Sequence, residues 1–168
     1  MKTPQSIEEF MAQALAMERE AAQRYEEIAD AMEMHNNREV AQLFRTMAGY
    51  EAKHAEAIMD EMNWVDAPGV PPGAWPAVES PEMIPGDAVH YLMHPWHALE
   101  LALAAEQRAE AFFAELARTA SDESVRRAAI GLRDEEAEHV AMVKQWMAKV
   151  PKPSSDWAND PDPPRYNE

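Results

Sequence analysis

The sequence contains no cysteine, only five glycines and no long apolar run. Without thiols the chain forms no disulfide, holds no iron–sulfur cluster and offers no thiolate to zinc or to catalysis. No stretch approaches the length of a membrane span. Near the N-terminus, Glu8 and Glu9 stand where a secretory signal would need apolar residues. We therefore expect a cytoplasmic protein without a membrane partner.

Strand-forming residues are scarce as well. Runs of Val, Ile and Thr are missing, whereas Ala, Glu, Met and Leu dominate, and these residues favour helix. All of the 13 prolines except Pro4 lie within 68–95 and 151–164. Because proline ends helices, these two segments are predicted to be connections. The 168 residues suffice for one all-α domain with a real core.

Basic residues are outnumbered by acidic ones, 15 to 31, which gives a formal net charge of −16. Such a charge repels nucleic acid and anionic membranes, so neither is expected as a partner. Solvated, Glu-rich helix faces explain most of this charge. The same balance is compatible with attracting cations.

Four long segments show the period of an amphipathic helix. They run from Ser6 to about Glu33, from the turn at 35–37 to about Asn63, from a start within 88–96 to about Ala120, and from Ser121 to Val150. Ser6 is the predicted N-cap of the first helix, with Glu9 completing a capping box, and Ser121 is the predicted N-cap of the last.

The connections between these segments predict the topology. Short turns join the first helix to the second and the third to the fourth, so each pair forms an antiparallel hairpin. The link between the hairpins is long enough to cross the whole bundle, which is the ferritin-like arrangement. We predict a ferritin-like four-helix bundle over residues 1–150, with the crossover at 64–90. Residues 151–168 are predicted to form a Pro-rich tail that is extended or disordered.

An internal repeat supports two related hairpins. Residues 18–29 align with 106–117, so that Glu18 matches Glu106 and Tyr25 matches Phe113. Further along each half, a Glu-Ala-x-His segment begins at Glu51 and again at Glu136. The repeat thus predicts that the chain consists of two copies of one helical hairpin, related by an approximate two-fold axis.

Six polar residues interrupt the apolar stripes of these helices. They are Glu18, Glu51, His54, Glu106, Glu136 and His139. A buried carboxylate without a partner costs several kcal/mol, so four of them at one level require cations. Two divalent ions would neutralise four carboxylates. A surface location or a core ion-pair cluster is the alternative, and the match of both hairpins argues against it.

The spacing of these residues suits metal binding. Residues three apart share one helix face, so each Glu-x-x-His pair presents an oxygen and a nitrogen to one point. One Glu from each of two helices and a Glu-x-x-His pair from each of the other two is the ligand pattern of di-iron carboxylate bundles. Carboxylate and imidazole ligands suit Fe, Mn or Zn and do not choose among them.

On these residues the sequence resembles the rubrerythrin-like branch of the ferritin-like superfamily, over about residues 6–149. The resemblance implies two iron ions, with Glu51 and Glu136 bridging them and the other four residues as terminal ligands. It also implies that Tyr25, seven residues after Glu18, donates a hydrogen bond to a ligand carboxylate. The alternative for Tyr25 is an aromatic core filler. Phe113, which aligns with Tyr25 in the repeat, has no hydroxyl group and cannot donate a hydrogen bond.

The sequence departs from the family pattern at three points. It lacks the four cysteines of a rubredoxin module, so an external protein is the expected electron donor. Ala109 stands where many rubrerythrins carry an extra carboxylate, which argues against their peroxidase mechanism. Ala52 follows Glu51 where bacterioferritin has its haem-ligating methionine, so no haem is expected.

These observations favour a di-iron oxidoreductase that reacts Fe(II) with peroxide or O₂, as a peroxide reductase or ferroxidase. The alternatives are an iron-storage protein that forms a shell and a structural metal-binding bundle without redox activity. A homodimer is expected, because the crossover and the tail would obstruct the contacts of a shell. For His90, His94 and His97 a surface or interface role is favoured over a second metal site on one helix face, because Pro95 and the nearby start of the helix leave their register undefined.

Overall fold

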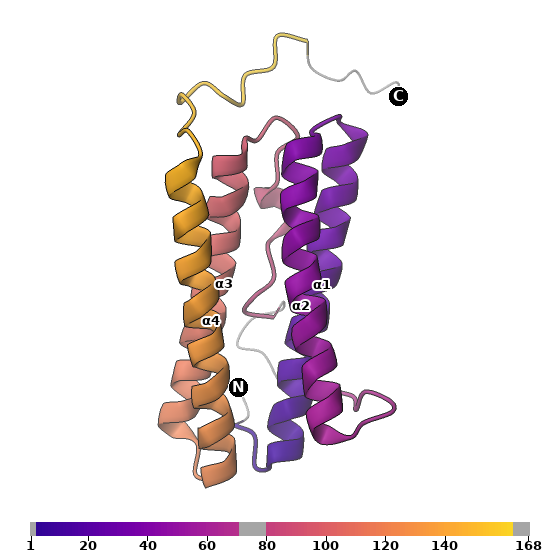
Figure 1. Ribbon diagram of the computed structural model, residues 1–168, viewed down its shortest axis with the longest axis vertical. Coiled ribbons are helices and arrows are strands. Elements are labelled where there is room, and N and C mark those ends of the chain that lie inside the picture. The colour runs from indigo at the N-terminus through magenta and orange to yellow at the C-terminus, as the bar shows by residue number, and fades with distance from the viewer. Residues whose placement is uncertain (1–2, 71–79, 163–168) are drawn as a thin grey trace.

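The computed structural model describes residues 3–70 and 80–162, and four long helices run through them. These are α1 (Ile7–Met34), α2 (Arg38–Met62), α3 (Pro95–Thr119) and α4 (Glu123–Lys149), with a short 3₁₀ helix, η1 (Gly86–Ala88), in the crossover. α1 packs on α2 and α3 on α4 as two antiparallel hairpins (Figure 1). The crossover returns along the bundle, so α2 and α3 run in the same direction (Figure 1). The predicted ferritin-like four-helix bundle is confirmed.

The N-terminal ends of two helices differ in detail from the prediction. Ser6 caps α1 as expected, since its Oγ accepts a hydrogen bond from Glu9 N at 3.2 Å. The Glu9 carboxylate, however, accepts from Gln5 N and not from the N-cap residue. The N-cap of α4 is Asp122 rather than Ser121, and its side chain accepts from Ser124 N and Val125 N. A carboxylate is favoured here because it also interacts with the positive end of the helix dipole.

The third helix begins at Pro95, with His94 as its N-cap. Proline suits this first position because its missing N–H has no partner within the helix anyway. The idea that His90, His94 and His97 share one helix face is therefore wrong, because only His97 lies in the helix. The rings of His90 and His97 instead contact Trp157, with ring centroids 5.2 Å and 3.9 Å away.

The described part of the tail, residues 151–162, contains turns and bends and no helix. Trp157 packs on the two histidines, and Tyr91 donates a hydrogen bond to Asp160 at 2.6 Å. These contacts hold this segment against the end of the bundle where α4 finishes.

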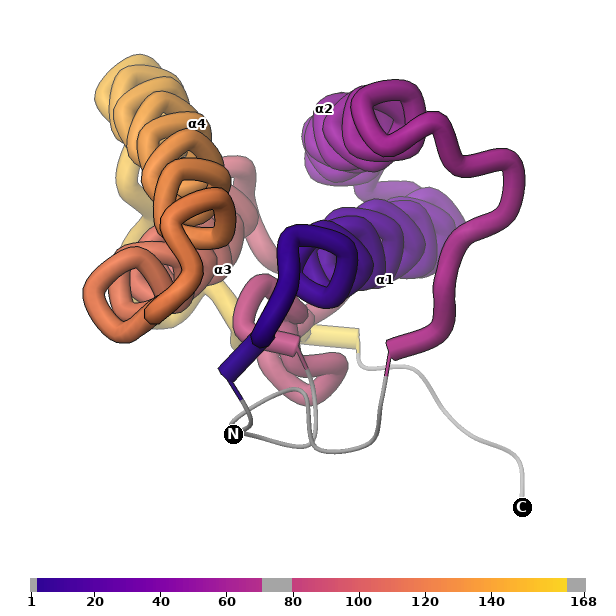
Figure 2. Tube along the Cα trace, turned by 90° about the horizontal axis from the view of Figure 1, so that it is seen from below, coloured from indigo at the N-terminus to yellow at the C-terminus, as the bar shows by residue number. Residues whose placement is uncertain are grey.

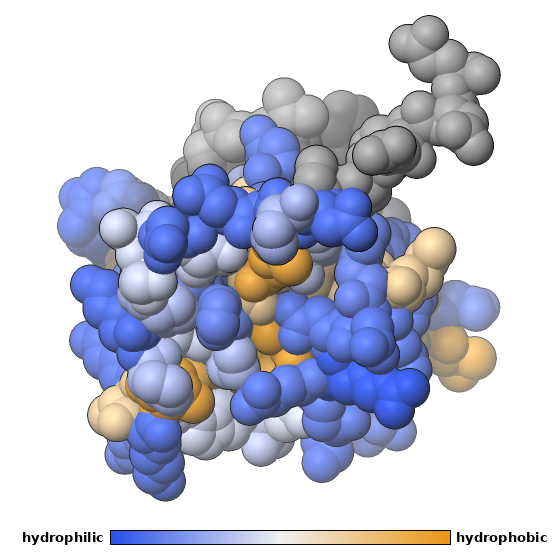
Figure 3. All heavy atoms as spheres, turned by 90° about the horizontal axis from the view of Figure 1, so that it is seen from above, coloured by the Kyte–Doolittle hydropathy of each residue, from blue (hydrophilic) through white to orange (hydrophobic). Residues whose placement is uncertain are grey.

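Seen from above, the molecule is largely hydrophilic, with hydrophobic groups gathered near the centre (Figure 3). Whether the tail and the bundle are separate units stays a prediction.

The hydrophobic core consists of two clusters. One contains α1 residues from Ala21 onward, α2 residues up to Ala48 and α3 residues up to Ala105. The other contains the first half of α1 up to Met17, the end of α2 from Ala55 and α3 from Ala109. On each helix, the gap between the two clusters is where the predicted acidic residues lie. A polar layer thus divides the core into two apolar halves.

The part of the crossover that leads into α3, residues 80–94, lies along one side of the bundle, between α1 and α3 (Figures 1 and 2). Arg108 of α3 donates hydrogen bonds to the carbonyl oxygens of Pro81 and Met83. Nearer the start of α3, Asn37 donates to Met93 O at 2.7 Å. α2 and α4 lie on the other side of the bundle (Figure 2). Within the described ranges, none of the helices combines the length and the apolar character that crossing a membrane requires.

Candidate metal centre

The six predicted residues meet in the polar layer. Glu18 comes from α1, Glu51 and His54 from α2, Glu106 from α3, and Glu136 and His139 from α4. All four glutamates are 0% exposed. The side chains of His54 and His139 are 24% and 12% exposed, so the imidazoles form the solvent-facing edge of the cluster. The repeat in the sequence brings equivalent residues from both hairpins to one level.

The potential ligand atoms fall into overlapping groups of the size that one ion needs. Glu18, Glu51 and His54 offer atoms within 4.8 Å of one another, and so do Glu51, Glu106 and His139. A third group joins Glu136 to the two histidines. Glu51, His54 and His139 each belong to two of these three groups, so the groups overlap. Their role as ligands stays a prediction, but their placement is that of a two-ion site.

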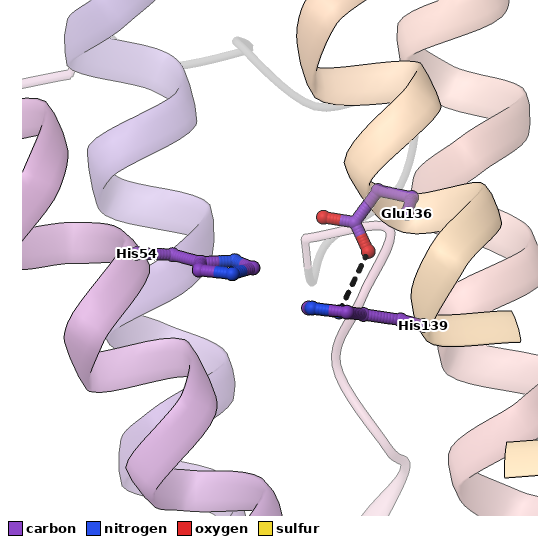
Figure 4. Close-up of side chains that lie close together, drawn as sticks. All are labelled: His54, Glu136 and His139. Carbon is purple, nitrogen blue, oxygen red and sulfur yellow. Dashed lines mark ion pairs between the residues drawn. The ribbon is translucent and has the colours of Figure 1, made fainter. Parts of the chain in front are cut away.

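The two histidines face each other across the gap between α2 and α4 (Figure 4). Their rings are stacked, with centroids 4.6 Å apart and planes at 15°. His139 also lies 3.6 Å from the Glu136 carboxylate, three residues earlier on the same helix (Figure 4). The pair thus presents nitrogen and oxygen atoms to the same space, as the spacing predicts.

The hydrogen bonding of the carboxylates decides whether a metal fits. Neither oxygen of Glu18, Glu51 or Glu136 accepts a hydrogen bond from a described residue, although all are buried. Buried polar groups without partners are rare in folded proteins, and each is costly. Carboxylate oxygens and imidazole nitrogens are ligands that divalent first-row metals accept. The cluster therefore fits a pair of such ions.

Glu106 differs from the other three carboxylates because protein groups hold both of its oxygens. Tyr25, 1% exposed, donates from its hydroxyl to Glu106 Oε1 at 3.4 Å. His139 Nδ1 lies 3.2 Å from Oε2. Burial opposes ionisation of Glu106, but the hydrogen bond and charge of His139 outweigh it and lower the pKa. Burial and the neighbouring carboxylates raise the pKa of Tyr25, so its hydroxyl keeps the proton that it donates.

The remaining carboxyl groups hold protons in the metal-free protein. Burial, with the charges of neighbouring carboxylates, raises the pKa of Glu18 to about 8 and that of Glu136 to about 9. The same causes raise the pKa of Glu51 well above its usual range. Burial opposes the charge on His139, but contacts with Glu106 and Glu136 dominate and raise its pKa to about 11. Protons thus occupy the positions that metal ions would neutralise.

A solved structure resembles this chain in both sequence and architecture. A structure of an uncharacterised conserved protein from Magnetospirillum magnetotacticum MS-1 is 37% identical, with a TM-score of 0.68. The match covers 89% of this chain and 98% of that one. The family model for rubrerythrin matches residues 9–75, which include Glu18, Glu51 and His54. The chain belongs to the rubrerythrin family. No curated protein is significantly similar to it.

This rubrerythrin contains a buried carboxylate that the sequence pattern did not single out. Glu82 lies in the crossover and is 1% exposed. One of its carboxylate oxygens lies within 4.8 Å of a carboxylate oxygen of Glu18 and of one of Glu136. Ala109, where the resemblance made an additional carboxylate an open question, is buried and offers none. The only sequence signal for Glu82 was an acidic residue beside the apolar pair Met83-Ile84, between two prolines.

We predict that the metal-free rubrerythrin loses stability as the pH rises from about 5 to about 9. The folded state keeps protons on Glu18 and Glu136 up to a pKa of about 8 and about 9, whereas an unfolded glutamate releases its proton near 4.5. His139 acts in the same direction between 6.5 and about 11. The free energy of unfolding therefore falls by about 1.4 kcal/mol per pH unit for each proton held only by the folded state.

Urea unfolding in the presence of a chelator at several pH values measures this slope. Glu136→Gln should make the slope shallower, because one titrating group is removed. Glu138→Gln is the matched control on an exposed neighbour of the same helix, and it should leave the slope unchanged. Stability that rises with pH across this range would contradict the assignment of protons.

Proposed function

We propose that this rubrerythrin is a di-iron oxidoreductase that oxidises Fe(II) with hydrogen peroxide or O₂. The observation that carries the proposal is the layer of buried carboxylates, three of which accept no hydrogen bond from a described residue, with two histidines at its edge. When bound, two Fe(II) ions supply the two electrons that convert one peroxide and two protons into two waters. The residues that would hold them are Glu18, Glu51, His54, Glu106, Glu136 and His139.

The protein's own groups support this reaction in defined ways. The two apolar halves of the core keep bulk water away from the layer, which strengthens every electrostatic interaction within it. Tyr25 and His139 fix the Glu106 carboxylate, so that its oxygens point in one direction before a metal arrives. Since the chain has no cysteine, electrons that restore Fe(II) come from a donor outside these 168 residues.

A surface pocket gives a small oxidant access to the histidine edge of the layer. It has a volume of about 650 Å³ and is formed by α1, α2 and α4. His54 is part of its wall, with apolar side chains such as Met11, Ile58 and Leu132 and charged side chains such as Glu61 and Arg127. A pocket of this size far exceeds what peroxide or O₂ needs, so larger substrates could also enter.

The first test concerns the iron site itself. Anaerobic titration of the metal-free protein with Fe(II) should show two ions per chain, and adding peroxide should oxidise them faster than free Fe(II). Glu51→Ala and His139→Ala should each lower the oxidation rate by at least about tenfold, a loss typical even of residues that only support metal ligands. Glu138→Ala, at an exposed position on α4, is the control and should behave as wild type. Oxidation no faster than that of free iron would refute the proposal.

The second test concerns the pocket. Gly131 lines it, and a Cβ added there would meet nothing within 4 Å. Gly131→Leu should therefore fold, gain helix propensity and fill part of the pocket. We expect oxidation by peroxide to slow several-fold while two Fe(II) ions still bind.

Gly49→Leu is the matched control, because Gly49 is also an exposed helical glycine with open space around its Cβ and lies outside the lining of this pocket. It should oxidise iron at the wild-type rate. Equal rates in both variants would show that oxidants reach the layer by another route.

A further inference from the structure

The crossover places the side chain of Glu82 in the polar layer, on the side opposite the histidines. Residues 80–84 alternate in burial, so that Ser80, Glu82 and Ile84 point inward while Pro81 and Met83 are half-buried. Ile84 belongs to one of the two hydrophobic clusters. Glu82 is therefore held beside the polar layer by apolar packing of its own segment.

Arg108 fixes the backbone on both sides of Glu82. Its guanidinium donates to Pro81 O at 2.9 Å and to Met83 O at 3.0 Å. Arg108 follows Glu106 by two residues on α3, so the same helix that contributes a carboxylate to the layer also anchors the crossover. These two bonds restrict the directions in which the Glu82 side chain can leave the backbone, and the carboxyl group points inward.

Inside the layer, Glu82 makes no hydrogen bond to a described residue through either oxygen. One of its oxygens lies within 4.8 Å of oxygens from both Glu18 and Glu136, which come from different hairpins. Three acidic oxygens at this separation repel one another when ionised. A cation between them removes that repulsion and satisfies all three groups.

We propose that Glu82 is a seventh ligand of the metal centre, a carboxylate that binds between Glu18 and Glu136 on the α1–α3 side. The inference rests on the two-ion centre of the proposed function, and not on its reaction with peroxide. A fifth carboxylate adds one negative charge to the four helix carboxylates. The centre therefore favours ions of higher charge more strongly than the six helix ligands alone would, and Fe(III) is stabilised relative to Fe(II).

Glu82→Gln tests this role, because the amide has the shape of a neutral carboxyl group but cannot act as an anionic ligand. The probe is Co(II), which binds oxygen and nitrogen ligands and whose visible absorption reports its coordination number. The metal-free full-length chain is titrated with Co(II) and followed by calorimetry and absorption. Glu138→Gln makes the same change of charge on an exposed residue.

We expect the wild type and Glu138→Gln to bind two Co(II) ions per chain with the same spectrum. Glu82→Gln should bind at least one ion about tenfold more weakly or worse, with a visible spectrum changed by the lost oxygen ligand. Glu82→Asp keeps the anion on a shorter side chain and should restore part of the affinity. Thermal unfolding of each metal-free variant shows that it is folded before metal is added.

The outcomes separate this inference from the proposed function. If the wild type binds fewer than two ions, the two-ion centre itself is refuted. If the wild type binds two ions and Glu82→Gln matches it in affinity and spectrum, the centre stands and Glu82 is only a buried neutral group. If Glu82→Gln alone is weakened and its spectrum is altered, Glu82 is a ligand whatever the rate with peroxide.

Discussion

The structure depends on the neutralisation of one acidic layer. Glu18, Glu51, Glu106 and Glu136 are fully buried between two apolar halves of the core. Burial of several carboxylates at one level is prohibitively costly if they stay ionised and alone, since each loses its hydration. In the metal-free chain, protons and the charged His139 offset this cost. Metal ions do the same while keeping the carboxylates ionised, which makes binding and folding parts of one equilibrium.

The two sides of this layer differ in their exposure to solvent. On the α2–α4 side, His54 and His139 are partly exposed, and His54 borders a pocket wide enough for small molecules. On the α1–α3 side, the crossover covers the layer and buries Glu82 there. Exchange with solvent is therefore directed to the imidazole side. The covered side is rich in acidic oxygens, and the described crossover segment around Glu82 is fixed to α3 through Arg108.

Most of the fold could be predicted from the sequence because helices have a fixed period. The polar residues Glu18, Glu51 and Glu136 stood out where the stripe required apolar ones, and the repeat placed them at one level. Glu82 could not be found in this way, because an irregular segment has no period against which an inward-facing residue can be recognised. The same reason explains why the contact of Trp157 with His97 was not anticipated.

Local helix ends were the other source of difference. Ser121 and Asp122 are adjacent, and Ser and Asp have similar preferences for the N-cap position. Residue preference alone therefore does not tell which of the two caps the helix. The sequence does not tell whether Pro95 stands at the first position of a helix or interrupts one. It was therefore open whether His90 and His94 lie in the same helix as His97. At both helix starts the contacts are local: Asp122 accepts from Ser124 N and Val125 N, and His94 N donates to the ring of His97.

The approximate two-fold symmetry of the hairpins is broken at one pair of aromatic residues. Tyr25 stacks on Phe44 in one half of the core and donates to Glu106, whereas Phe113 packs edge-on against Phe10 in the other half and has no proton to donate. The phenol thus lowers the basicity of the Glu106 carboxylate, whereas the Glu18 carboxylate accepts no hydrogen bond from a described residue. The two hairpins are similar in sequence, yet this hydroxyl group gives one side of the layer a hydrogen-bond donor where the other side has only a hydrocarbon ring.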